Sequence, residues 1–330
     1  MLIEVTEPSQ AGEARRTAAA LAEELNMSEE RRGQIALVTT EMATNLVKHA
    51  GRGHILFRSL EESSRCGLQI TSVDNGPGIT DVARALDNGP LASGSLGSGL
   101  GTIKRVPDFF DLYSVPGFGT VVSAEFWNSA KASRENSPIQ VGVVSEPVRG
   151  EEVCGDGWYV RNSQNGALLM VVDGLGHGPF ASEAAREAER VAASSRGTSL
   201  RGILTDVHDA LKKTRGAAAA MAQIDIERGL LTFAGIGNVG AAIVTKGLGR
   251  SLTSHNGTLG HTMERIQEFT YPWSPESILV MHSDGLVSRW DLERYPGIWN
   301  KPASVIAALL HRDFVRGRDD VTVLVAKVAP

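Results

Sequence analysis

Apolar positions in the first 127 residues follow a helical period first and a strand period afterwards. A helix is predicted over residues 11–25 and a second over residues 28–49, where apolar side chains recur at i, i+3, i+7 and i+11 from Ile35. Strand-like segments follow at residues 54–60, 68–73, 109–115 and 120–126, with a helix-like segment at 102–110. Helices that alternate with an antiparallel-looking sheet predict an α+β first half.

The second half has a different pattern, in which short apolar strands outnumber helices. Strands are expected at residues 141–144, 158–162, 168–172, 220–226, 230–235, 241–245, 278–282 and 321–325. Helices are expected at residues 181–193, 200–213 and 303–312. Many strands with a few helices predict a β-sandwich flanked by helices.

A polar segment without periodicity, residues 128–138, separates the two patterns and is interpreted as a linker. The chain has 330 residues, which is typical of two domains, and its 42% hydrophobic and 22% charged residues fit an ordinary globular protein. We therefore predict one domain at residues 1–127 and another at residues 139–330.

Charge and cysteine content narrow the function classes. Residues 1–127 carry 11 basic and 16 acidic side chains and the remainder carries 22 of each, so neither half has the positive excess that attracts nucleic acid or anionic lipid. Cys66 and Cys154 alone cannot form a disulfide framework. No apolar run approaches the ~20 residues that span a bilayer, and the first ten residues lack the pattern of a secretory signal. The expectation is a cytoplasmic protein with reduced thiols that binds neither nucleic acid nor membrane.

Polar motifs in the first half can form a nucleotide site. Glu41 and Asn45 are four residues apart on the predicted second helix, so they share a face, although a solvated face has the same pattern. Asp74 ends an apolar strand and is followed by Gly76 and Gly78. A carboxylate there can accept a hydrogen bond from the exocyclic amine of a purine, and the glycines let the backbone approach the base, although a simple turn has the same residues.

A glycine-rich stretch, residues 93–101, precedes the helix-like segment. Its N–H groups and the helix N-terminus could cradle phosphates, although the same composition suits a flexible linker. No strand comes directly before the stretch, so it is neither a P-loop nor a dinucleotide-binding fingerprint.

In this order, with Gly119 and Thr120 opening the last strand, the motifs resemble the GHKL (Bergerat) ATPase fold of histidine kinases and anti-sigma factors. Over nearly all of residues 1–127 the chain is similar to the RsbT-like switch kinases of bacterial stress pathways, in the runs TTEMATNLVKHAG, DNGPGI and GLGTIKR. The resemblance implies that the domain uses ATP and Mg²⁺.

The same resemblance implies roles for individual residues. Glu41 would be the general base of phosphoryl transfer, and Asn45 would hold Mg²⁺. The implied adenine site consists of Asp74, Gly76, Gly78 and Thr120. The implied lid over the triphosphate, with its basic neighbour, consists of Gly94, Gly97, Gly99, Leu100, Gly101 and Lys104.

Acidic residues stand at the ends of apolar strands in the second half: Asp156, Asp173, Asp284 and Asp319–Asp320. A single acid at such a place is usually a turn cap, but several at one edge of a sandwich would make a site for hard cations. Asp320 is the neighbour of Asp319 on a strand, so it points the other way and is not expected to be a ligand.

This arrangement resembles the PPM family of metal-dependent Ser/Thr phosphatases, specifically its SpoIIE-type group, over about residues 140–327. The runs KTRGA and GIGNV are similar to the RsbX-like phosphatases of the same stress pathways. The resemblance implies two Mn²⁺ or Mg²⁺ ions and a metal-activated water, without a phosphoenzyme. The implied ligands are Asp156, Asp173, Asp284, Asp319 and the Gly174 carbonyl. No basic phosphate clamp is evident, and His177 and Cys154 are disfavoured as general acid and nucleophile.

Together the resemblances imply a bifunctional regulator of a partner-switching pathway, which phosphorylates Ser or Thr on a partner and removes such phosphates. The implied partners are STAS-domain proteins of the anti-sigma-antagonist or stressosome-scaffold type, with a downstream regulator phosphatase as a further candidate. Opposed activities in one chain require different phosphosites or a gate. Two alternatives stay open, in which the first domain is a nucleotide-sensing binding module without kinase activity or an anti-sigma factor.

Overall fold

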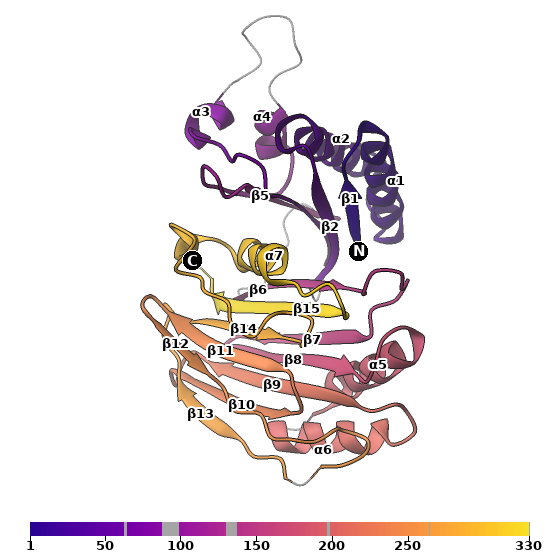
Figure 1. Ribbon diagram of the computed structural model, residues 1–330, viewed down its shortest axis with the longest axis vertical. Coiled ribbons are helices and arrows are strands. Elements are labelled where there is room, and N and C mark those ends of the chain that lie inside the picture. The colour runs from indigo at the N-terminus through magenta and orange to yellow at the C-terminus, as the bar shows by residue number, and fades with distance from the viewer. Residues whose placement is uncertain (63–64, 88–98, 130–136, 197–198, 264, 330) are drawn as a thin grey trace, which may run out of the picture. The chain divides into compact units, whose positions relative to one another are not determined.

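The computed structural model describes residues 1–330 except 63–64, 88–98, 130–136, 197–198, 264 and 330. The chain divides into two compact units, Met1–Glu135 and Asn136–Pro330 (Figure 1). Each unit has its own sheet or sheets, its own helices and its own hydrophobic core. No helix in the described part of the chain combines the length and the apolarity that crossing a membrane requires.

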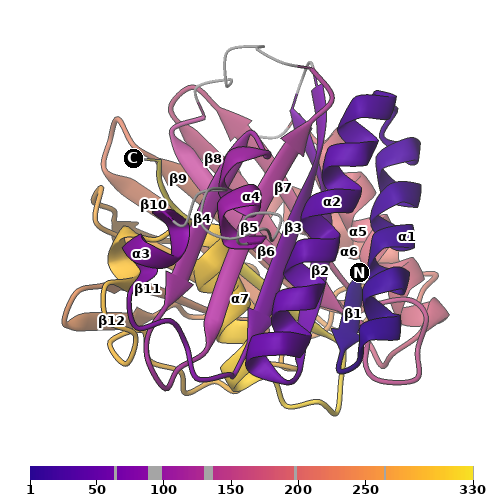
Figure 2. The same ribbon diagram turned by 90° about the horizontal axis from the view of Figure 1, so that it is seen from above.

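The first unit is a five-stranded antiparallel sheet in the order β1-β2-β3-β5-β4, with helices packed on one face (Figure 2). Its elements are β1 (Leu2–Val5), α1 (Pro8–Glu24), α2 (Glu29–Asn45), a π-helical turn (Leu46–Ala50), β2 (Gly53–Glu62), β3 (Arg65–Asp74), α3 (Val82–Asp87), α4 (Gly99–Arg105), β4 (Phe109–Ser114) and β5 (Thr120–Trp127). Ser28 caps α2 by accepting a hydrogen bond from the Arg31 N–H at 3.2 Å.

The helical layer of this unit is held by apolar contact. The buried face of α1 is lined by alanines, which let α1 lie close to α2. Ile35 and Val38 of α2 are fully buried in the same core as Ile55 and Ile70 of the sheet. Each fully buried side chain of this kind contributes about 1.5–3 kcal/mol, so this packing positions the end of α2 over the sheet.

Three details differ from the expected elements. The helix expected at residues 28–49 is α-helical only to Asn45 and then widens into the π-helical turn, which ends at Gly51 with a φ of 78°. The helix-like segment expected at 102–110 is α4, which ends at Arg105 because Phe109 and Phe110 pair with β5. The short elements β1 and α3 were too brief for a periodic signal.

The second unit consists of two five-stranded antiparallel sheets, in the orders β13-β10-β9-β8-β7 and β12-β11-β14-β15-β6. Its strands are β6 (Ile139–Glu146), β7 (Asp156–Ser163), β8 (Gly166–Gly174), β9 (Ala217–Asp225), β10 (Leu230–Ile236), β11 (Gly240–Thr245), β12 (Leu248–Ser251), β13 (Phe269–Pro272), β14 (Ile278–His282) and β15 (Val321–Val328). All expected strands are present, and the structure has two further strands, β12 and β13, that were not expected. The inner faces of the two sheets share one core, which includes Leu169, Phe233, Leu279 and Leu324.

Helices cover the outer faces of this sandwich (Figure 1). The helices are α5 (Pro179–Ser194), α6 (Leu200–Leu211) and α7 (Ala303–Phe314), with a 3₁₀ turn at Ile298–Asn300. Helices α5 and α6 form a second core with β8, β9 and β10, and α7 contacts β6 and β15. The mixed helix and sheet class predicted for both halves is therefore confirmed.

Candidate nucleotide and metal sites

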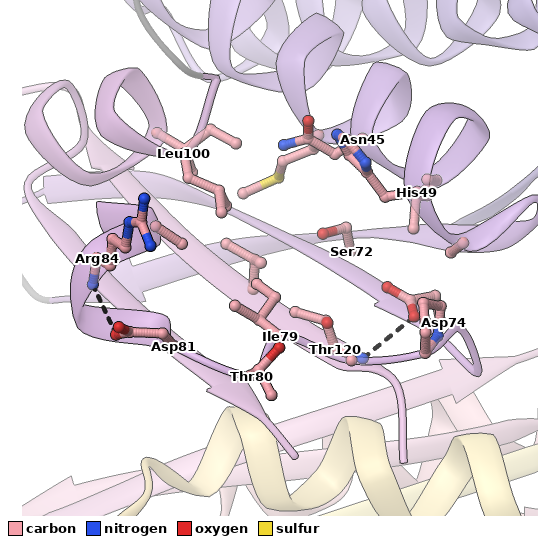
Figure 3. A pocket seen from close by; sticks show the side chains of 18 residues that line it. Asn45, His49, Ser72, Asp74, Ile79, Thr80, Asp81, Arg84, Leu100 and Thr120 are labelled. Carbon is pink, nitrogen blue, oxygen red and sulfur yellow. Dashed lines mark hydrogen bonds between the residues drawn. The ribbon is translucent and has the colours of Figure 1, made fainter. Parts of the chain in front are cut away.

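A cavity of about 590 Å³ lies in the first unit, at the C-terminal end of α2 (Figure 3). Among the residues that line it are Asn45, Asp74, Gly78, Leu100 and Thr120, which come from four separate segments of the chain. The fold therefore brings most of the predicted adenine site to one place, together with the helix residue predicted to hold Mg²⁺.

Asn45 and Glu41 lie on the last turns of α2 and approach the beginning of α4. The Asn45 Nδ2 atom is buried and has no hydrogen-bond partner among the described residues. A Cβ atom at Gly99 would overlap the Glu41 carboxylate and lie 3.4 Å from Asn45 Oδ1, so the start of α4 lies directly against both side chains. Glu41 is half-buried and is not among the described residues that line the cavity.

The Asp74 carboxylate is oriented by the backbone around it. Its Oδ1 atom accepts a hydrogen bond from the Gly76 N–H at 2.8 Å. It accepts a second from the Thr120 N–H at 3.2 Å (Figure 3). Gly119 has a φ of 75°, and a Cβ atom there would overlap the Asp74 carbonyl. The loop after β3 and the start of β5 therefore form one rigid wall of the cavity.

Ser114, which sequence reasoning missed, ties this wall together. Its Oγ atom accepts a hydrogen bond from the Ile79 N–H at 2.8 Å and donates one to the Gly119 carbonyl at 3.1 Å. The same Oγ atom lies 2.9 Å from Thr120 Oγ1. Because these partners are close only in the folded chain, no sequence spacing indicated the role of Ser114.

Only part of the predicted lid lies within the described residues. Gly94 and Gly97 lie outside the described residues. Gly99 opens α4 and Gly101 is buried within it. Lys104 is exposed on α4 and is not among the described residues of the cavity lining.

Two other basic side chains line the cavity instead. His49, in the π-helical turn, and Arg84, on α3, are both lining residues (Figure 3). Asp81 caps α3 by accepting a hydrogen bond from the Arg84 N–H at 2.9 Å. No sequence pattern indicated a role for Arg84, because α3 was not expected.

The acids of the second unit gather at the strand ends of the sandwich. Asp156 and Asp173 are register partners on β7 and β8. The Ser283 hydroxyl donates a hydrogen bond of 2.6 Å to Asp156 Oδ2, and the Asn238 amide donates one of 2.6 Å to Asp284 Oδ2. Neither donor was identified from the sequence.

The pKa values indicate that these carboxylates act on one another. Burial raises the pKa of Asp156 well above its ordinary value, and the charge of Asp173 raises it further. Burial raises the pKa of Asp173 to about 7, with added contributions from Asp284 and Asp319. All four predicted acidic ligands therefore share one electrostatic cluster, and oxygen donors of this kind suit hard divalent cations.

The carboxylates are nevertheless engaged by protein donors. In the part of the chain that the structure describes, no group of three His, Cys, Asp or Glu side chains is already arranged to hold a metal ion. Gly174, predicted to contribute its carbonyl, is buried and donates its N–H to the Gly155 carbonyl at 3.1 Å. The cluster fits a cation in its chemistry, and its side chains would have to turn toward the ion.

Asp320 has a different environment from its neighbour Asp319. It is 3% exposed, and its two carboxylate oxygens each accept a hydrogen bond of 2.7 Å, one from the Val148 N–H and one from the Gly155 N–H. Asp320 therefore holds the loop that leads into Asp156.

Two further residues near the acids were considered for chemistry. Burial raises the pKa of the Cys154 thiol to about 12, with Asp156 adding to the shift, so the nucleophilic thiolate is scarce at neutral pH. His177 is exposed, and its Nδ1 atom lies 2.6 Å from Glu151 Oε1.

Comparisons with known proteins agree with this division. The family model "Histidine kinase-like ATPase domain" matches residues 5–126, and the model "Stage II sporulation protein E (SpoIIE)" matches residues 163–329. The serine/threonine-protein kinase RsbT of Bacillus subtilis (strain 168) is 36% identical over 107 residues, which are 32% of this chain and 80% of RsbT. The phosphoserine phosphatase RsbX of the same organism is 27% identical over 154 residues, which are 46% of this chain and 77% of RsbX.

A solved structure described as "The bacterial stressosome: a modular system that has been adapted to control secondary messenger signaling" is also similar. It is 29% identical with a TM-score of 0.54, and the match covers 57% of this chain and 99% of that one.

Proposed function

Because this chain belongs to the SpoIIE family of PP2C-type phosphatases through residues 163–329 and to the RsbT-like histidine kinase-like ATPases through residues 5–126, we propose that it both phosphorylates and dephosphorylates Ser or Thr of partner proteins. The observation that carries the proposal is the presence of two separate sites in one chain. Asn45 and Asp74 line a nucleotide-sized cavity in one unit, and four mutually interacting aspartates form a cluster in the other.

In the phosphatase unit, Asp156, Asp173, Asp284 and Asp319 would hold two Mn²⁺ or Mg²⁺ ions. The ions, when bound, supply a water activated for in-line attack on the phosphoester. Ser283 and Asn238 limit the rotation of the carboxylates to which they donate, and Asp320 fixes the loop before Asp156.

In the kinase unit, Asp74 would accept a hydrogen bond from the adenine amine, and the Asn45 amide oxygen would contact the Mg²⁺ of Mg·ATP. Glu41 would take the proton from the Ser or Thr hydroxyl as its oxygen binds the γ-phosphoryl group and ADP leaves. The buried, unpartnered Nδ2 of Asn45 supports a polar ligand at this point, because such groups are rarely left unsatisfied.

STAS-domain proteins of the anti-sigma-antagonist or stressosome-scaffold type are the proposed partners. The support is the similarity to RsbT, to RsbX and to the stressosome structure. These matches also support a role in a partner-switching regulatory system, for which we propose a cytoplasmic location.

One observation favours a second candidate function for the first unit. Glu41 is against Gly99 and is not among the described residues of the cavity lining, which suits a unit that binds nucleotide without transferring phosphate.

Intact-mass measurement of a co-encoded STAS protein distinguishes these functions. With the full chain and Mg·ATP, the STAS protein should gain one phosphate, and with Mn²⁺ and no ATP it should lose it. Loss without gain would support the nucleotide-sensing module. If the phosphorylated STAS protein loses no phosphate at any Mn²⁺ concentration, the phosphatase assignment is refuted.

A further inference from the structure

The turn that follows Asp173 lies beside the turn that precedes β9. The β8–β9 register pairs Gly174 with Ala217, and one step farther the Leu175 N–H donates to the Gly216 carbonyl at 3.0 Å. One more step brings Arg215 opposite Gly176, where a Cβ atom would lie 3.1 Å from Arg215 Nη1. Arg215 is thus two residues beyond the last strand pair, about 7 Å along the strand direction.

The backbone of Arg215 is fixed in this place. Its carbonyl oxygen lies 2.9 Å from His261 Nε2, and the Gly216 N–H donates to Thr214 Oγ1 at 3.0 Å. Gly216 has a φ of 80°, and a Cβ atom there would crowd the Leu259 carbonyl at 2.6 Å. These contacts hold the backbone of the turn that carries Arg215.

The guanidinium of Arg215 is held by an aromatic ring and by little else. It lies 4.9 Å from the ring centre of Phe180, which is 60% exposed in the first turn of α5. Within the described residues, no ion pair or hydrogen bond engages it. A guanidinium stacked on a ring keeps the N–H groups of its edge available, in a planar fork that matches two phosphate oxygens.

The acid cluster gives this free cation a role. Four carboxylates would cancel the charge of the two divalent ions proposed for the site, so a further positive group at its rim would favour binding of a phosphate dianion. We propose that Arg215 binds the non-bridging oxygens of the phosphomonoester in the phosphatase site, with Phe180 as the positioning residue that holds the guanidinium. This inference rests on the phosphatase activity proposed above and assigns the basic phosphate clamp that was not evident from sequence patterns.

The test uses the full chain with saturating Mn²⁺ and p-nitrophenyl phosphate as the substrate. Arg215→Ala should lower kcat/KM about 10–100-fold, mainly through KM, because a charge-assisted hydrogen-bond pair is lost. The inhibition constant of inorganic phosphate should rise in parallel, while the Mn²⁺ concentration for half-maximal activity stays unchanged. Arg215→Lys should recover part of the affinity, and Phe180→Leu should give an intermediate KM.

Arg250 provides the matched control. Arg250 is exposed on β12, and its guanidinium lies 4.8 Å from the ring centre of Tyr271 on β13. It is therefore an exposed arginine stacked on an aromatic ring, as Arg215 is. Arg250→Ala should behave as the wild type in every assay. If Arg215→Ala and Arg250→Ala have equal KM values and equal phosphate inhibition, the proposal is wrong.

Two further outcomes separate the possible failures. If Arg215→Ala impairs hydrolysis of a phosphoprotein but not of p-nitrophenyl phosphate, Arg215 contacts the partner surface and the phosphate contact is refuted. If the wild type hydrolyses nothing, the phosphatase assignment fails by itself. Calorimetric titration of inorganic phosphate into the Mn²⁺-saturated chain then still tests Arg215, because equal affinities for wild type and Arg215→Ala would overturn the clamp.

Discussion

Asp156 and Asp173 lie directly opposite each other on the antiparallel strands β7 and β8, so two carboxylates share one partly buried strand end. Like charges in this position destabilise a sheet. Burial and the neighbouring acids together raise the pKa of Asp173 from 3.8 to about 7. The arrangement that suits a cation is therefore costly for the fold by itself.

In the presence of a chelator, Asp173→Asn should be more stable than the wild type. With Mn²⁺, the same variant should release no phosphate from a substrate. The wild type loses stability as the pH rises from about 4 to about 7, because the folded state resists ionisation of Asp173 over that window. The advantage of the variant should grow through the same window and reach about 4 kcal/mol at pH 8, because one pKa unit corresponds to about 1.4 kcal/mol, which would raise Tm by roughly 10 °C. Thermal melts across this range check it, with Asp206→Asn, at an exposed position of α6, as the control. An unchanged Tm at pH 8 would contradict mutual repulsion.

Substitutions of Glu41 and Asn45 should impair different steps of the proposed kinase reaction. Glu41→Gln should bind Mg·ATP nearly as well as the wild type but transfer phosphate at least about 100-fold more slowly, because a positioned base is lost. Asn45→Ala should weaken Mg·ATP binding itself. Calorimetry and a phosphotransfer assay separate the two, with Glu30→Gln in the first turn of α2 as control. A normal transfer rate for Glu41→Gln would show that another group is the base.

Asp74→Asn should reduce ATP affinity about tenfold, with a smaller effect on folding than on ATP binding. The amide oxygen can still accept from the N–H groups of Gly76 and Thr120, while the second oxygen, which would accept from adenine, is replaced by a donor. Nucleotide titration and a thermal melt on the same sample check this. A large fall in Tm would mean that Asp74 acts mainly in folding.

Gly119→Ala and Gly117→Ala form a matched pair in one turn. Both glycines have positive φ, 75° and 81°, but a Cβ atom would overlap the Asp74 carbonyl at Gly119 and meet nothing within 4 Å at Gly117. Gly117→Ala should cost about 1 kcal/mol, and Gly119→Ala about 3 kcal/mol or more. Urea unfolding measures both, and ATP affinity should fall only for Gly119→Ala. Equal costs would mean that the turn relaxes.

The two halves should be separable at the predicted linker. Fragments 1–127 and 139–330 should each be soluble, the first binding ATP and the second hydrolysing phosphoserine with Mn²⁺, because each contains its own sheets and core. Circular dichroism and the two activity assays check this. Aggregation of fragment 139–330 would place the boundary elsewhere.

Local patterns predicted most of this architecture. The apolar strands and the Asp74 and Asp173 motifs are written in contiguous residues, so periodicity and turn chemistry were sufficient to identify them. The roles of Ser114, Asp320 and Arg215 depend on partners distant in the chain, which spacing cannot reveal. The strand β12 was not predicted, because all four of its residues are exposed and show no alternation of apolar and polar side chains. The π-helical turn was predicted as part of one continuous helix, because its first residue, Leu46, continues the apolar stripe of α2.

The strand order of the second sandwich bears on how the chain is synthesised. Among the described residues, strand β6 pairs with β15 alone, so the first strand of the unit has no neighbour in its sheet until the last one has been made. At about 5–20 residues per second, a ribosome needs roughly 10–40 s to extend the chain from the end of the first unit to β15. During that interval the nucleotide-binding unit can already fold, whereas the sandwich cannot close. Each new molecule therefore passes through a period in which only the first of its two units is complete.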